Sequence, residues 1–110
     1  MSSFINRGLL MATVAALLAA PSAFAASNTC KMAKEPWKCT TQSVPANPQG
    51  NFVHIDVSPR VKYKVYDSKN GAMVHSGRGG WTGTRKTITG LYGKYHVKAE
   101  GPGFVTINNN

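Results

Sequence analysis

The chain has 110 residues, of which 13 are Lys or Arg and 4 are Asp or Glu, so its formal net charge at pH 7 is +9. This length is enough for one domain with a modest core and too short for two. The cations are scattered, and no run of five or six of them occurs, which excludes a disordered basic tail.

The first 25 residues have the features of a secretory signal peptide. Arg7 precedes an apolar run over residues 8–20, and small residues at Ala23 and Ala25 suit cleavage after Ala25. The apolar run is too short for a membrane anchor, which needs about 20 residues. A buried N-terminal helix is the alternative, but Ala-x-Ala beside Pro and Ser is an unusual end for a core helix. We therefore expect a soluble chain that is periplasmic or secreted.

The net charge of the exported chain predicts the sign of the charge on its partner. Removal of residues 1–25, which hold one cation and no acid, would leave 85 residues with twelve cations and four acids, a formal charge of +8. So large a charge on so small a body favours attraction to polyanions. We expect an anionic polysaccharide, lipopolysaccharide or another envelope component as partner, or a protein, rather than nucleic acid. The alternative is that the charge only keeps the domain soluble.

Cys30 and Cys39 are the two cysteines, and an even count in an exported protein predicts one disulfide. A metal or redox role would need further ligands or Cys-x-x-Cys spacing. Between the cysteines, Trp37 is either an exposed ligand-binding side chain or a side chain that packs over the core as a lid. Residues 40–50 are rich in Pro, Thr, Gln and Asn and predict a linker. We therefore expect a disulfide-closed segment with its linker over residues 26–50 and the domain proper over residues 51–110.

Strand patterns follow one another after Gly50. Apolar and polar residues alternate in residues 51–57, 60–66 and 94–100, which is the period of half-buried strands. Three shorter strands are predicted over 72–76, 84–89 and 104–108. The Asn70-Gly71 pair predicts a hairpin turn, and residues 77–83 a glycine-rich loop. These features predict an all-β fold, a small antiparallel β-sandwich or barrel of about six strands.

The turn before the strand over residues 94–100 has a recognisable spacing. Leu91 lies four residues before Tyr95, and the turn between the two strands contains Gly90 and Gly93. At this spacing a tyrosine that starts a strand can fold its ring over the turn and hydrogen-bond back to the backbone.

The runs YKVYDSKNGAMVHSG and ITGLYGKYHVKAEGPGF resemble the transthyretin-like and immunoglobulin-like sandwich modules of exported bacterial proteins. In those modules a strand that ends in Tyr-Asp, an Asn-Gly turn and Leu-x-Gly-x-Tyr-x-Val recur in this order. The resemblance covers residues 61–104. It implies a β-sandwich used for binding, spacing or display, and it brings no catalytic residues with it.

Motifs for catalysis or metal binding are absent from the sequence. His54, His75 and His96 fall on three different predicted strands, and the pair of His54 with Asp56 lacks a third ligand. The sequence has no Gly-x-Ser-x-Gly and no glycine motif that enters a helix to cradle phosphate. We therefore expect no enzyme, no metal site and no cofactor.

Outward cations and one aromatic loop are the candidate binding groups. Repeated cations on a strand face need either solvent or an anionic partner, although exposed lysines also discourage edge-to-edge aggregation. In the glycine-rich loop, the Trp81 indole either stacks on a ligand or folds over the open end of the sandwich. The candidate residues for binding an anionic ligand are Arg60, Lys62, Lys64, Arg78, Trp81, Lys94, His96 and Lys98.

Three classes of function agree with these features. A cationic binding module would lose affinity in salt, with Trp81, Tyr66 or Tyr92 adding stacking. A structural or protein-interaction subunit of the envelope, such as a surface antigen, would carry its charge incidentally. A secreted effector or antimicrobial protein also agrees with the size, the charge and the disulfide.

Overall fold

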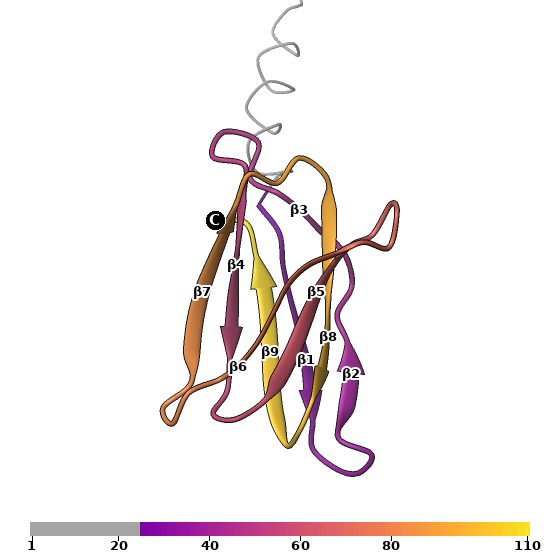
Figure 1. Cartoon of the computed structure of the whole chain (residues 1–110), viewed down its shortest axis with the longest axis vertical. Coiled ribbons are helices and arrows are strands. Elements are labelled where there is room, and N and C mark those ends of the chain that lie inside the picture. Colours follow the sequence, from indigo (N-terminus) through magenta and orange to yellow (C-terminus); the bar gives the residue numbers. More distant parts are fainter. Residues whose placement is uncertain (1–24) are drawn as a thin grey trace, which may run out of the picture.

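A computed structural model describes residues 25–110 (Figure 1). The predicted signal peptide, residues 1–25, lies outside the described residues apart from Ala25. Residues 25–110 form strands and no helix, and this part of the chain therefore has no helix that could cross a membrane. The strands are β1 (Ser27–Met32), β2 (Lys38–Thr40), β3 (Val44–Pro45), β4 (Phe52–Val57), β5 (Lys62–Asp67), β6 (Met73–Arg78), β7 (Thr84–Thr89), β8 (Lys94–Glu100) and β9 (Gly103–Asn108).

The strands build two antiparallel sheets that face each other as a β-sandwich (Figure 1). The first sheet has the order β1-β9-β4-β7 and the second the order β2-β8-β5-β6, with β3 also paired to β8. The predicted Asn70-Gly71 turn joins β5 to β6 within one sheet, and Gly71 has the positive φ of 76° that favours glycine there. The all-β sandwich that the sequence predicts is thus confirmed.

Alternation decides which side chains enter the space between the sheets. In β4, for example, Val53, Ile55 and Val57 are buried while the residues between them are partly exposed. The same period governs β5 and β8, as predicted, and so one face of each sheet supplies the core. The other buried residues of these strands and of β9 are Tyr63, Val65, Tyr95, Val97, Ala99, Val105 and Ile107.

The tyrosine turn before β8 forms as the spacing predicts. The backbone N–H groups of Tyr92 and Gly93 donate hydrogen bonds to the Tyr95 hydroxyl oxygen, at 3.1 and 3.2 Å. Leu91 is buried in the same turn. The phenol therefore closes the turn from inside the fold.

The structure differs from the prediction over residues 26–50, because this segment contributes β1, β2 and β3 and raises the strand number from the expected six to nine. β1 completes an edge of the first sheet, and β2 and β3 pair with β8 at an edge of the second. The predicted disulfide is confirmed, and it joins Cys30 in β1 to Cys39 in β2, across the two sheets. Trp37 is partly buried and packs against the core, which favours the lid interpretation.

The strand predicted over residues 72–76 begins and ends later than expected. β6 includes Gly77 and Arg78, so the glycine-rich loop begins only at Gly79. A side chain at Gly77 would put a Cβ 2.9 Å from the Tyr63 hydroxyl oxygen. This glycine therefore makes room for a buried ring within the sheet.

Candidate functional site

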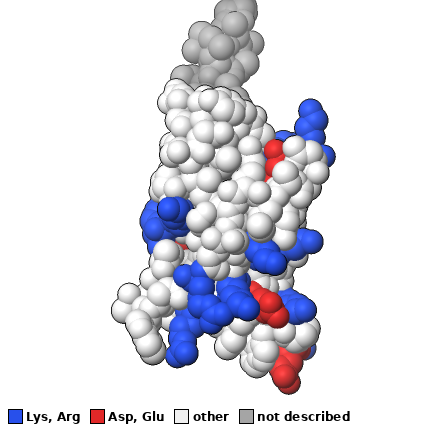
Figure 2. All heavy atoms as spheres, viewed as in Figure 1, with Lys and Arg blue, Asp and Glu red and all other residues white. Residues whose placement is uncertain are grey.

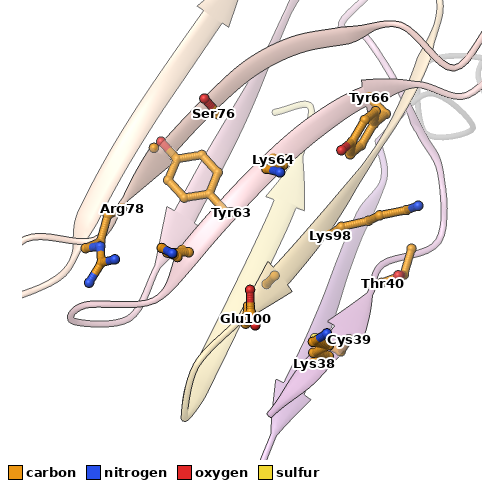
Figure 3. A pocket seen from close by; sticks show the side chains of 13 residues that line it. Lys38, Cys39, Thr40, Tyr63, Lys64, Tyr66, Ser76, Arg78, Lys98 and Glu100 are labelled. Carbon is orange, nitrogen blue, oxygen red and sulfur yellow. The ribbon is translucent and has the colours of Figure 1, made fainter. Parts of the chain in front are cut away.

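A shallow, open depression of about 620 Å³ lies over the outer face of the second sheet (Figure 3). The four neighbouring strands β2, β8, β5 and β6 all contribute to it. Its charged lining residues are Lys38, Lys62, Lys64, Arg78, Lys98 and Glu100. We call this surface the cationic face.

Strand register brings these charges together from distant parts of the sequence. One row across the four strands consists of Lys38, Glu100, Lys62 and Arg78. The next row consists of Thr40, Lys98, Lys64 and Ser76. Neighbouring strands lie about 4.8 Å apart, and successive outward residues on one strand about 6.7 Å apart. Five cations therefore share a small area with a single carboxylate.

The positive charge of the cationic face is not neutralised by ion pairs within the described part of the chain. The ion pair found between residues 25 and 110 joins Arg85 Nε to Asp56 Oδ1 at 3.8 Å, on the outer face of the other sheet. Lys64 even lies directly opposite Lys98 in the register. In the space-filling view, blue atoms gather over the lower half of the molecule with few red atoms among them (Figure 2).

Aromatic side chains border the cationic face on the same sheet. Tyr66 follows Lys64 on β5, and the Lys98 Nζ lies 5.2 Å from the centroid of its ring. The His96 ring stacks with the Tyr66 ring, with centroids 5.7 Å apart, and His96 Nδ1 is hydrogen-bonded to the Ser68 hydroxyl at 2.6 Å. The half-exposed Tyr66 ring can therefore add a stacking surface to a set of cations.

The structure divides the predicted binding residues into three places. Lys62, Lys64, Arg78 and Lys98 converge on the cationic face. Lys94 and His96 lie further along β8 and do not line the depression. Arg60 and Trp81 form a separate pair at one end of the sandwich, with the guanidinium carbon 4.8 Å from the indole centroid. The indole is 82% exposed, so it does not fold over the open end.

Lys38 and Thr40 belong to the cationic face but are missing from the predicted set. The sequence does carry a signal for them. Cys39 must point inward to reach Cys30 across the sandwich, and so its two neighbours must point outward on the same strand.

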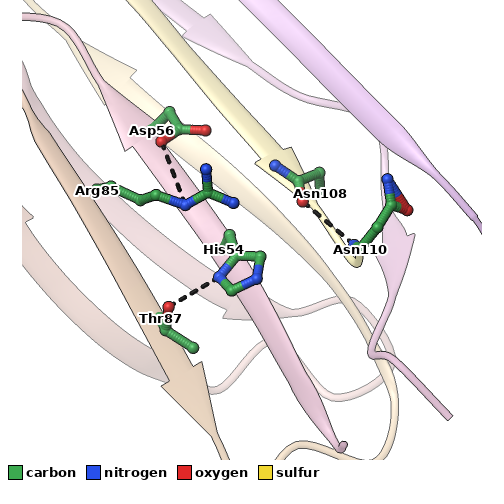
Figure 4. A network of polar contacts seen from close by, with 6 residues as sticks. All are labelled: His54, Asp56, Arg85, Thr87, Asn108 and Asn110. Atoms are coloured by element: carbon green, nitrogen blue, oxygen red, sulfur yellow. Dashed lines mark hydrogen bonds and ion pairs between the residues drawn. The ribbon is translucent and has the colours of Figure 1, made fainter. Parts of the chain in front are cut away.

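The histidines do not come together as metal ligands. His54 Nδ1 is hydrogen-bonded to Thr87 Oγ1 at 2.8 Å, and Asp56 pairs with Arg85 (Figure 4). Beside them, the backbone N–H of Asn110 donates to Asn108 Oδ1 at 3.2 Å (Figure 4). Within residues 25–110, no group of three His, Cys, Asp or Glu side chains could hold a metal ion.

His75 lies on the inner side of β6, where its Nε2 is 3.0 Å from the Tyr63 hydroxyl oxygen. Burial lowers the pKa of His75, and the nearby charge of Lys86 lowers it further. Burial also raises the pKa of Tyr63, so this phenol keeps its proton at neutral pH. The Tyr63 hydroxyl therefore shares a hydrogen bond with a neutral imidazole, which is a structural contact at the edge of the core.

Comparison with protein-family models finds none that matches the chain, and no curated protein matches it.

Proposed function

We propose that the protein is an exported, non-catalytic β-sandwich module that binds an anionic envelope polymer, an acidic polysaccharide or the saccharide part of lipopolysaccharide, on the cationic face. The observation that carries the proposal is the convergence of five cations and one carboxylate on one open depression. Such a field attracts polyanions and raises their local concentration.

The shape of the site favours a polymer over a small ligand. Small-molecule sites usually enclose most of their ligand, whereas this depression is open and spans four strands. The backbone positions of neighbouring outward residues on this face are about 5 to 7 Å apart along and across the strands. An extended chain with repeated negative charges can contact several of the cations at once, with a sugar ring against Tyr66.

Export is supported by two independent features. The disulfide joins the edge strands of the two sheets, and such bonds persist in oxidising compartments. The first 25 residues carry a leader pattern. We further propose that the sandwich is of the immunoglobulin-like or transthyretin-like kind, supported by the turn closed by Tyr95.

Heparin, a sulfated polysaccharide, is a suitable probe for the test. Binding should weaken steeply between about 0.1 M and about 1 M NaCl, where the Debye length falls from roughly 10 Å to roughly 3 Å. The double variant Lys64→Glu/Lys98→Glu should bind about tenfold more weakly or worse, since each exposed charge contact contributes about 0.2–1 kcal/mol and reversal turns attraction into repulsion.

A matched control separates the site from the total charge. Lys31→Glu/Lys69→Glu changes the net charge by the same amount at exposed positions away from the cationic face. It should lose much less affinity than the double variant on the face. Equal losses in the two variants, or binding that salt leaves unchanged, would contradict the proposal.

A further inference from the structure

At one end of the sandwich, beyond the cationic face, Arg60 and Trp81 present an exposed aromatic ring with a cation on it. We infer that this pair is a second subsite for the same polymer, in which a sugar ring stacks on the free side of the indole and Arg60, on its other side, attracts an acidic group of a neighbouring sugar. The inference rests on the proposed function above.

The pair is held in place by the backbone around it. Gly79 donates its N–H to the Val61 carbonyl oxygen at 2.9 Å and accepts one from Arg60 at 3.0 Å, which fastens the loop to the turn before β5. A Cβ at Gly79 would collide with the Ser58 carbonyl oxygen, so only glycine permits this approach.

The tip of the loop is also ordered by hydrogen bonds. The N–H of Gly83 donates to the Gly80 carbonyl oxygen at 3.1 Å, and the N–H of Gly80 donates to Thr84 Oγ1 at 2.9 Å. Trp81 therefore stands on a closed turn. A ring that is already positioned loses less conformational entropy when it binds a ligand.

The indole has no packing role that would explain it. Trp81 is 82% exposed, whereas Trp37 packs against the core. Leaving so large an apolar ring in water forgoes about 1.5–3 kcal/mol of burial energy or more. The planar Arg60 guanidinium covers one side of the ring, which leaves the other side open for stacking.

The position of the pair makes it continuous with the cationic face. Arg78 lies opposite Lys62 in the strand register of that face, and Trp81 follows Arg78 by three residues. Three residues span at most roughly 10 Å. An oligosaccharide that leaves the face past Arg78 can therefore reach the indole, whereas a shorter one that fills the face cannot.

A saccharide suits this end better than a lipid surface does. The neighbours of Trp81 in its loop are glycines and threonines rather than further apolar residues. Tyr92, which is equally exposed, lies past the other end of β7 and cannot join it. Phe104, which is 40% exposed, lines a hollow with Thr82 and Gly83 at the same end. Two separate rings and one cation do not make an apolar patch large enough to enter a membrane.

The experiment uses Trp81 as its own reporter. In a Trp37→Phe variant the remaining indole emission comes from Trp81, and heparin oligosaccharides of increasing length are titrated while affinity is followed by calorimetry. Short oligosaccharides should bind without changing the emission. Above a threshold length, the emission should change and the affinity should rise about five- to tenfold, as expected for an aromatic stacking contact.

Variants in the wild-type background provide the independent readout. Trp81→Ala should abolish the gain with length and keep the affinity for short oligosaccharides. Tyr92→Ala, an equally exposed ring at the opposite end, should change neither. Absence of binding at any length would overturn the proposed function. Binding at all lengths with no response of Trp81 would overturn the subsite alone, and so would a Trp81 response to vesicles of anionic lipid in place of oligosaccharides.

Discussion

Tyr95 shows how one hydroxyl can hold a turn. Its oxygen accepts two backbone hydrogen bonds while its ring is buried. In Tyr95→Phe these two N–H groups lose their partner, and we expect the free energy of unfolding to fall by about 1–3 kcal/mol in urea denaturation. Tyr92→Phe is the matched control, because this ring is exposed and the change should lie within about 0.5 kcal/mol. Equal effects would show that the hydroxyl of Tyr95 has no special role.

His75 makes the stability of the protein depend on pH. Because its pKa is lowered in the folded state, first by burial and then by Lys86, the unfolded chain binds a proton at higher pH than the folded one. The free energy of unfolding should therefore fall as pH drops below the unfolded value of about 6.5, and level off below the folded pKa. Urea denaturation of wild type and His75→Gln at pH values across this window should show that the variant loses part of the slope.

An NMR titration of the His75 ring checks the cause directly. The groups that face this ring are the Tyr63 hydroxyl on β5 and the Lys86 ammonium on β7. Lys86→Met should raise the pKa of His75 towards its ordinary value, since it removes one of the two causes. A folded-state pKa at or above the ordinary value in wild type would contradict the account.

At the scale of elements, the central strands were predictable and the edge strands were not. β4 and β8, and β5 up to Val65, are buried on one face, so alternation appears in the sequence. β1 is mostly exposed or partly exposed, and β3 has only two residues. An edge strand has one neighbouring strand instead of two, so less of its surface is covered and it needs little apolar content. Backbone pairing holds it in place, and the sequence does not display that pairing.

The candidate site was predictable in part for the same reason. Alternation places Lys62 and Lys64 on an outer face without any knowledge of the fold. That Arg78 and Lys98 lie beside them depends on register between strands far apart in sequence. Register follows from the packing of the whole sheet, so it could not be derived from any one strand.

The disulfide acts at the scale of elements too, because it fastens β1 to β2 and hence one sheet to the other. The variant Cys30→Ala/Cys39→Ala should unfold with a free energy lower by about 2–3 kcal/mol, the chain-entropy value for a loop this short. Urea denaturation with and without reductant measures the effect. Reductant should lower the stability of wild type and leave the variant unchanged. A double variant as stable as oxidised wild type would contradict the prediction.

The whole molecule has two unlike faces. The outer face of the second sheet carries the five cations of the depression, with Glu100 the one acid among them. The outer face of the first sheet has hydroxyl and imidazole contacts, such as Thr29 to Thr106 at 2.6 Å and His54 to Thr87. A partner attracted by charge should therefore meet the protein on one side.

Lysine acetylation followed by mass spectrometry tests this sidedness. When heparin is bound, Lys38, Lys62, Lys64 and Lys98 should be protected several-fold, because their ammonium groups are paired with sulfate. Lys31 and Lys69, which lie away from the depression, should stay as reactive as in the free protein. Uniform protection of all lysines would mean that the polymer coats the molecule without regard to its faces.

The two opposed lysines have a consequence for stability. Because Lys64 and Lys98 lie directly opposite each other in the register, their like charges repel and lower the stability of the sheet. A polyanion laid over them relieves this repulsion. A bound polyanion should therefore raise the midpoint temperature of thermal unfolding, so that ligand binding also stabilises the fold.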